Sequence, residues 1–184
     1  MRYVVAFVIA GLSKQIGANK PFNPILGETY QAHYPEHGVQ VFMEQVSHHP
    51  PVSSWEVRDQ QGRFSFTGLA NWAASTRGNS VKGWQTGVNQ VVFHSDGARI
   101  SWELPPLLLK GVMWGERVLK YQGDIQFKDH TNDVVCNMEV DPKQAGGFMR
   151  LFGGGKSKEV WYPDICRGVL LHRGQEVDRC EGTW

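Results

Sequence analysis

The chain has 184 residues, of which 41% are hydrophobic and 20% are charged, so it is long enough for one globular domain with a sizeable core. The formal net charge of +1 excludes a global electrostatic field that would recruit nucleic acid or an anionic membrane. The 21 glycines and 7 tryptophans favour turns and strands over a helical bundle.

Residues 1–12 form the first apolar segment. A run of this length cannot span a bilayer, which takes about 20 apolar residues. An arginine followed by apolar residues is also compatible with a short signal peptide. Five of the apolar residues, however, fit one face of a helix: Val4, Val5, Val8, Ile9 and Leu12. We therefore expect a helix that buries this face.

Residues 20–30 read Lys-Pro-Phe-Asn-Pro-Ile-Leu-Gly-Glu-Thr-Tyr and contain two groups suited to a phosphorylated ligand. Lys20 offers a mobile ammonium beside a proline that stiffens its backbone. Asn23 also precedes a proline, and its side-chain amide can donate and accept hydrogen bonds. Hydrogen bonds between a charged group and a phosphate are stronger than neutral ones.

Residues 44–51 read Glu-Gln-Val-Ser-His-His-Pro-Pro and are the most informative stretch of the chain. The two prolines fix φ and lack an N–H donor, and His49 is biased toward extended geometry by the proline that follows it. Neighbouring side chains of an extended chain point to opposite faces, so the backbone must bend if His48 and His49 are to reach one target. A rigid corner that presents two imidazoles suits an anion such as a phosphate.

The residues alone leave other roles for this histidine pair open. A metal site needs three or four convergent ligands, whereas the other histidines are scattered and show no H-E-x-x-H spacing, so we expect no metal or other cofactor. Ser47 is an adjacent nucleophile, but no G-x-S-x-G context surrounds it, which makes a serine hydrolase a distant alternative. A metal-dependent hydrolase is likewise a distant alternative, because the convergent ligands are missing. A structural corner, in which the rings are only hydrogen-bonded, is a further alternative.

Period-two alternation of apolar and polar residues dominates from residue 39 to residue 140, which is typical of half-buried antiparallel strands. It is cleanest at Val134, Cys136, Met138 and Val140. Turn signals separate the expected strands at residues 36–38, 59–62, 95–97 and 129–133. Many short strands at close spacing predict a mainly β fold, an antiparallel barrel or half-barrel preceded by the N-terminal helix.

Residues 143–158 interrupt this pattern. They contain two glycine clusters, four basic residues, no acidic residue and interleaved Phe, Met and Leu. The apolar side chains of such a loop either fold back on the barrel or touch an anionic bilayer.

The cysteines, Cys136, Cys166 and Cys180, are widely spaced and form no C-x-x-C pair. They are expected to be reduced thiols, packed as small apolar side chains in a cytosolic protein.

The two motifs resemble the signature of the oxysterol-binding protein family. Residues 20–28 are similar to its Lys-Pro-x-Asn-Pro-x-Leu-Gly-Glu segment, and residues 44–51 resemble its Glu-Gln-Val-Ser-His-His-Pro-Pro octapeptide, in the same order and at a familiar separation. Weaker likenesses at residues 77–78, 123–125 and 182–184 extend the resemblance over most of the chain.

The resemblance implies that Lys20, Asn23, His48 and His49 bind the headgroup of phosphatidylinositol 4-phosphate at the barrel mouth. It places the acyl chains, or a competing sterol or phosphatidylserine, in an apolar tunnel. Family members exchange such lipids between apposed membranes. The implied protein is therefore a lipid-transfer protein and not an enzyme, cytoplasmic and peripheral to membranes, with transient membrane contact and no nucleic-acid partner.

The family domain is longer than this chain, with a lid before the matched region and a closing helical region after it. Residues 1–184 are therefore expected to form a single lipid-binding domain that is incomplete at both ends. Such a domain should bind and transfer lipid weakly and self-associate. The alternative is an interaction or scaffold remnant that keeps the barrel face and holds no lipid.

Overall fold

The computed structural model describes residues 1–16, 23–142 and 164–184, which form one helix and thirteen strands. The helix is α1 (Arg2–Ile16). The strands are β1 (Thr29–Tyr34), β2 (Val39–Ser47), β3 (Val52–Asp59), β4 (Phe64–Arg77), β5 (Ser80–Thr86), β6 (Asn89–Phe93), β7 (Arg99–Trp102), β8 (Leu107–Lys110), β9 (Val118–Tyr121), β10 (Gly123–Asp129), β11 (Val134–Val140), β12 (Ile165–His172) and β13 (Gln175–Thr183).

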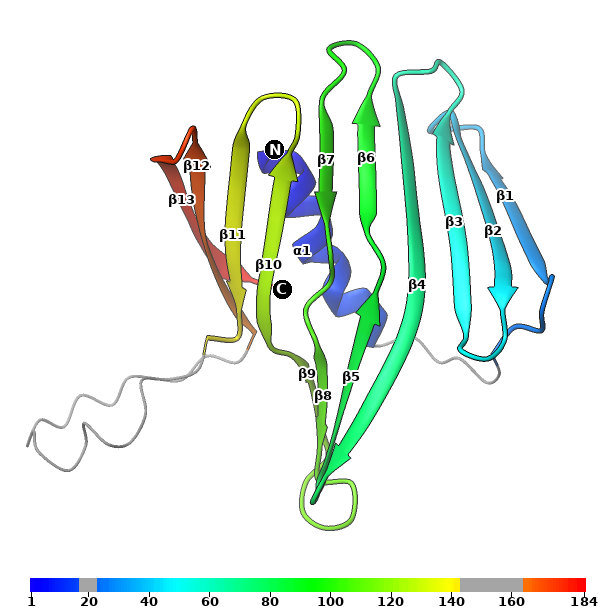
Figure 1. Cartoon of the computed structure of the whole chain (residues 1–184), viewed down its shortest axis with the longest axis vertical. Helices are drawn as coiled ribbons and strands as arrows, with labels where there is room; N and C mark the ends of the chain where they lie inside the picture. The colour runs from blue at the N-terminus through cyan, green and yellow to red at the C-terminus, as the bar shows by residue number, and fades with distance from the viewer. Residues whose placement is uncertain (17–22, 143–163) are drawn as a thin grey trace, which may run out of the picture.

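All strand pairs of the described residues are antiparallel, and together they make one curved sheet (Figure 1). The main path runs β1-β2-β3-β4-β6-β7-β10-β11-β12-β13, and the sheet ends at β1 and β13. Strands β5, β8 and β9 lie off this path, where β5 pairs with β4, β8 with β5, and β9 with β8. This mainly β, partial-barrel architecture with an N-terminal helix confirms the fold expected from the sequence.

Strand β4 is the longest strand and has two pairing partners on one side. Its first half pairs with β6, and residues 71–77 pair with β5. Its pairing with β3 ends where Val52 meets Asn71, so residues 72–77 run past the end of β3. At about 3.3 Å per residue, the β4–β5 hairpin projects roughly 20 Å beyond that point. Figure 1 shows this projection, which also carries β8 and β9.

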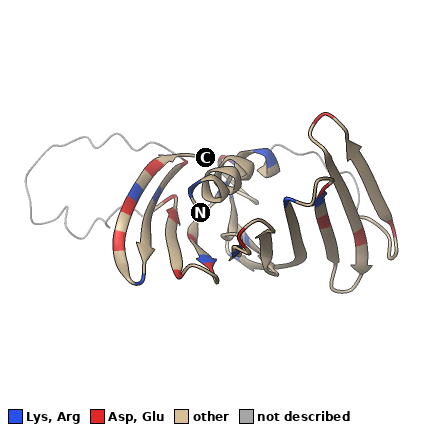
Figure 2. Cartoon of the chain, turned by 90° about the horizontal axis from the view of Figure 1, so that it is seen from above, with Lys and Arg blue, Asp and Glu red and all other residues tan. Residues whose placement is uncertain are grey.

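Helix α1 lies over the concave face of the sheet (Figure 2). Its buried residues are Val4, Val5, Val8, Ile9 and Leu12, which confirms the predicted helix and its buried face. Tyr121 anchors the helix, because its hydroxyl donates a hydrogen bond to Gln15 Oε1 at 2.7 Å. Burial raises the pKa of Tyr121 to about 12. In the part of the chain that the structure describes, no helix is long and apolar enough to cross a membrane.

The predicted alternation is realised on the two strands beside the helix. In β10, Ile125 and Phe127 are buried while their neighbours are exposed, and Cys136, Met138 and Val140 repeat this pattern in β11. The predicted turns also form. Gly38 and Gly97 have φ of 62° and 69°, a conformation that glycine adopts without steric cost.

Cys136 and Cys166 are buried free thiols, as expected, but Cys180 is exposed. Cys180 lies on β13, which ends the described sheet and is therefore covered less completely. The predicted loop at residues 143–158 lies outside the described residues, and its two alternative roles stay predictions.

Candidate lipid-binding site

The Leu-Gly-Glu part of the first motif forms a tight turn before β1. Glu28 closes the turn twice: its backbone N–H donates to Ile25 O at 3.0 Å, and its carboxylate Oε2 accepts from Ile25 N at 3.0 Å. Gly27 sits in the turn with φ of 80°, which favours glycine. The glycine and the acid of this motif are therefore explained by backbone geometry.

This turn pairs directly with the second motif. Gly27 N donates to Gln45 O at 2.8 Å, and Gln45 N donates to Glu28 O at 3.0 Å. Thr29 then faces Glu44 at the start of the β1–β2 ladder. The structure thus joins two segments that are separate in the sequence into one unit.

Gln45 is the buried centre of that unit, with an exposed fraction of 2%. Its amide Nε2 donates to Ser47 O at 2.8 Å, and its Oε1 accepts from Ser53 Oγ at 2.5 Å. The strand register shifts between Gln45 and Ser47, where β2 pairs irregularly with β3. The glutamine therefore ties together the two strand ends on either side of residues 48–51.

His48 and His49 lie in the four-residue turn between β2 and β3, and both are exposed. Their rings meet edge to face, with centroids 4.7 Å apart and an interplanar angle of 67°. The backbone therefore bends enough to bring neighbouring imidazoles together. The described residues contain no group of three or more His, Cys, Asp or Glu placed to bind a metal ion.

The other two predicted ligands are less well defined. Asn23 is exposed and lies just before the turn that pairs with Gln45. Lys20 lies outside the described residues. Convergence of all four groups on one ligand stays a prediction. Sequence reasoning missed the positioning roles of Glu28, Gln45 and Ser53, although two of these residues belong to the quoted motifs.

The concave face next to the histidine turn is apolar and partly open. Tyr30, Met43 and Trp55 are directly opposite one another on β1, β2 and β3, so their side chains share this face. Tyr30 is 54% exposed and Met43 is 39% exposed. The Trp55 ring lies across Gly68, where an added Cβ would overlap it.

A row of aromatic contacts connects this open face to the core under α1. Trp55 meets Phe66 edge to face, Phe66 stacks on Trp102, and Trp102 contacts Phe127, with centroid distances of 6.3, 5.5 and 5.7 Å. Phe127 is fully buried. The concave face is therefore a continuous apolar surface from the core to β3, the strand that follows the histidine turn.

An apolar cavity of about 370 Å³ lies between α1 and strands β11–β13. Val5, Ile9, Cys136, Met138 and Leu170 contribute to its lining. This volume lies within the range of small-molecule pockets, and its wall is suited to a hydrocarbon.

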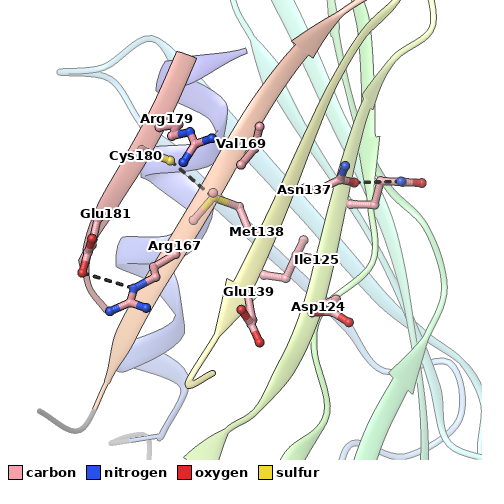
Figure 3. A pocket seen from close by; sticks show the side chains of 12 residues that line it. Asp124, Ile125, Asn137, Met138, Glu139, Arg167, Val169, Arg179, Cys180 and Glu181 are labelled. Carbon is pink, nitrogen blue, oxygen red and sulfur yellow. Dashed lines mark hydrogen bonds and ion pairs between the residues drawn. The ribbon is translucent and has the colours of Figure 1, made fainter. Parts of the chain in front are cut away.

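A larger hollow of about 770 Å³ lies over β10–β13 and has a different character (Figure 3). The strand register places Asp124, Glu139, Arg167 and Glu181 in one row across four strands. Arg167 Nε pairs with Glu181 Oε1 at 3.2 Å, as the dashed line in Figure 3 shows. With three acids and one paired base, the row disfavours a phosphate.

The family model described as Oxysterol-binding protein matches residues 1–184. The chain belongs to the oxysterol-binding protein family. Oxysterol-binding protein 9 of Dictyostelium discoideum is 41% identical over 152 residues, which are 83% of this chain and 35% of that protein. Oxysterol-binding protein-related protein 3 of Mus musculus is 33% identical over 187 residues, covering 100% of this chain and 20% of that protein.

Solved structures share the fold at lower identity. The Osh1 ORD domain in complex with cholesterol superposes with a TM-score of 0.80 at 22% identity, covering 99% of this chain and 40% of that one. The Osh3 ORD of Saccharomyces cerevisiae in complex with PI(4)P has a TM-score of 0.78 at 20% identity, with coverages of 100% and 47%. The chain thus spans less than half the length of these relatives.

Proposed function

We propose that residues 48–51 bind the phosphorylated headgroup of phosphatidylinositol 4-phosphate, with His48 and His49 contacting the phosphate directly and Lys20 and Asn23 completing the site. The pairing of the two motifs through Gln45 supports this most strongly, because it brings the segment after Asn23 beside the strand that ends at the histidines. The complex of the related Osh3 ORD with PI(4)P supports the same ligand chemistry.

The apolar part of the lipid then lies on the concave face. Tyr30, Met43 and Trp55 offer an open apolar surface next to the histidine turn, and a sterol or acyl chains can cover it. The complex of the Osh1 ORD domain with cholesterol supports a sterol as cargo. A protein that binds both ends of a lipid can carry it between membranes without catalysing a reaction, as a cytoplasmic protein peripheral to those membranes.

A double variant, His48→Ala with His49→Ala, tests the headgroup site. Removing charge-assisted hydrogen bonds should weaken binding of a soluble short-chain phosphatidylinositol 4-phosphate by at least about tenfold, measured by calorimetry. Because both side chains are exposed, the free energy of unfolding should change by less than about 0.5 kcal/mol. Equal affinity of the variant and the parent would exclude these histidines as ligands.

The matched control is His37→Ala with His172→Ala, which removes two exposed imidazoles, one from the β1–β2 turn and one from the last residue of β12, at the opposite end of the sheet. This control should bind the headgroup like the parent.

Mass spectrometry of lipids that co-purify with the chain separates this function from the scaffold alternative. Phosphoinositide, sterol or phospholipid retained in stoichiometric amount supports the lipid-carrying function. Transfer is then measured as movement of a fluorescent sterol between two vesicle populations. A chain that purifies without lipid and transfers none is the expected result for a scaffold.

A further inference from the structure

The loop between β8 and β9, residues 111–117, exposes apolar side chains at the end of the projecting hairpin. Met113 is 72% exposed and Trp114 is 64% exposed. Val112 beside them is also exposed. Large apolar side chains that gather at one exposed point indicate an interaction site more strongly than the same residues scattered singly.

This exposure is built into an ordered loop. The side-chain Oδ1 of Asn79 accepts hydrogen bonds from the backbone N–H of Met113 at 2.7 Å and of Trp114 at 3.2 Å, and its Nδ2 donates to Trp114 O at 2.6 Å. The backbone oxygen of Asn79 also accepts from Gly111 N at 3.1 Å. The β4–β5 turn therefore holds the loop in the conformation that points Met113 and Trp114 into solvent.

Gly111 fixes the same loop from within. Its φ is 70°, and an added Cβ would overlap the backbone oxygen of Glu116. A loop that closes so tightly on its own backbone cannot easily fold its apolar residues back onto the sheet. The exposed tryptophan is therefore a property of the loop's backbone geometry.

The charges around the loop are mostly positive. Arg77, Lys82, Lys110 and Arg117 are exposed there, against one acid, Glu116. Among the ion pairs of the described residues, none involves any of these five side chains. Lys110 faces Ser80, which in turn faces Arg77, so the strand pairing places both cations close to the loop of residues 111–117. Basic charge beside exposed apolar residues complements an anionic bilayer, where tryptophan is favoured at the headgroup level.

The loop of residues 111–117 also lies toward the end of the sheet that carries the histidine turn. Residues 48–51 connect β2 to β3 at the end past which β4 and β5 project (Figure 1). A flat partner that contacts this loop therefore faces the end of the sheet that carries the histidine turn.

We propose that residues 77–79 and 111–117, which we call the hairpin tip, dock the protein on an anionic lipid bilayer, with Met113 and Trp114 inserted at the interface and the surrounding cations above the anionic headgroups. This inference extends the proposed function by naming the surface that meets the membrane. Docking of the hairpin tip needs no phosphoinositide, so the docking proposal and the headgroup-binding proposal can fail separately.

The test is flotation with vesicles of phosphatidylcholine and about one third phosphatidylserine, without phosphoinositide. The double variant Met113→Ser with Trp114→Ser should reduce vesicle binding about tenfold, because the buried apolar area is lost. Arg77→Gln with Arg117→Gln should reduce it by a similar factor at low salt and by less at high salt, since salt screens the attraction. The matched control, Tyr34→Ser with Val177→Ser, removes exposed apolar side chains from the opposite end and should bind like the parent.

Three results would overturn the docking proposal. The first is a parent chain that does not bind these vesicles, and the second is a Met113/Trp114 variant that binds them like the parent. The third is a variant whose oligomeric state changes in sedimentation velocity while its vesicle binding does not, which would make the tip a contact between copies. In each case, calorimetry with the soluble headgroup still decides the histidine site. The His48/His49 double variant should bind these vesicles normally.

Discussion

Replacing Gln45 with alanine tests whether a buried amide shapes the histidine turn. Two hydrogen bonds depend on this side chain, from Nε2 to Ser47 O at 2.8 Å and from Ser53 Oγ to Oε1 at 2.5 Å. Losing them and leaving their partners unpaired should lower the free energy of unfolding by about 2–3 kcal/mol. Ser47 directly precedes the histidines, so part of this energy holds the histidine turn in the conformation that the structure shows.

The variant should therefore bind the headgroup more weakly although no proposed ligand has changed. If the ligand has to reorder the turn at a cost of about 1.4 kcal/mol, its dissociation constant rises about tenfold. Urea unfolding followed by circular dichroism gives the stability change, and calorimetry with soluble phosphatidylinositol 4-phosphate gives the affinity.

Gln85→Ala is the matched control. Gln85 lies on β5 and is 7% exposed. Its amide donates a single hydrogen bond to Leu69 O of β4 at 3.0 Å. This variant removes the same atoms from a similar environment, costs about 1–2 kcal/mol, and should leave headgroup affinity unchanged. If Gln45→Ala weakens the affinity no more than Gln85→Ala does, the amide stabilises the fold without positioning the histidines.

Two further predictions concern stability. Gly168→Ala should destabilise the fold by about 1–3 kcal/mol, because the added Cβ would overlap the sulfur of Met138, whereas Gly182→Ala on the neighbouring strand meets nothing within 4 Å. Equal urea midpoints for the two variants would refute the packing argument. Hydrogen bonds from the Arg63 side chain lower the pKa of Asp59 from 3.8 to about 2, so the stability they give is complete above pH 3.8 and lost as the pH falls toward about 2. Asp59→Asn should flatten acid unfolding in that window, and an unchanged slope would contradict this assignment.

The helix and the central strands were predictable from the sequence because their burial follows local periodicity. The five helix positions with apolar spacing are the five that are buried. On β11, Cys136 and Met138 face the helix and Asn137 faces away, as the alternation predicts. In both cases one side of the element is fully covered, so a periodic pattern maps directly onto burial.

The same reasoning fails where coverage is incomplete or partners are distant. Met43 alternates correctly on β2 but is 39% exposed, because α1 covers a different part of the concave face. The partners of Gln45 depend on a register shift between β2 and β3, which period-two patterning does not specify. The tip depends on Asn79 meeting Trp114 across 35 positions of sequence, a contact that no local pattern indicates.

The distance between the tip and the histidine turn bears on how a lipid would be recognised. The tip extends roughly 20 Å beyond the end of β3, whereas apolar side chains at an interface penetrate only about 5–10 Å. A protein resting upright on its tip would therefore hold His48 and His49 about 10 Å or more above the headgroups. The histidines can reach a phosphate in the membrane plane only if the sheet tilts toward β1–β3, or if the lipid has already left the bilayer. Tyr30 and Met43, which form the open apolar face, lie on β1 and β2, so a tilt toward β1–β3 also brings this face toward the membrane. We therefore expect headgroup capture and withdrawal of the apolar chain to occur together.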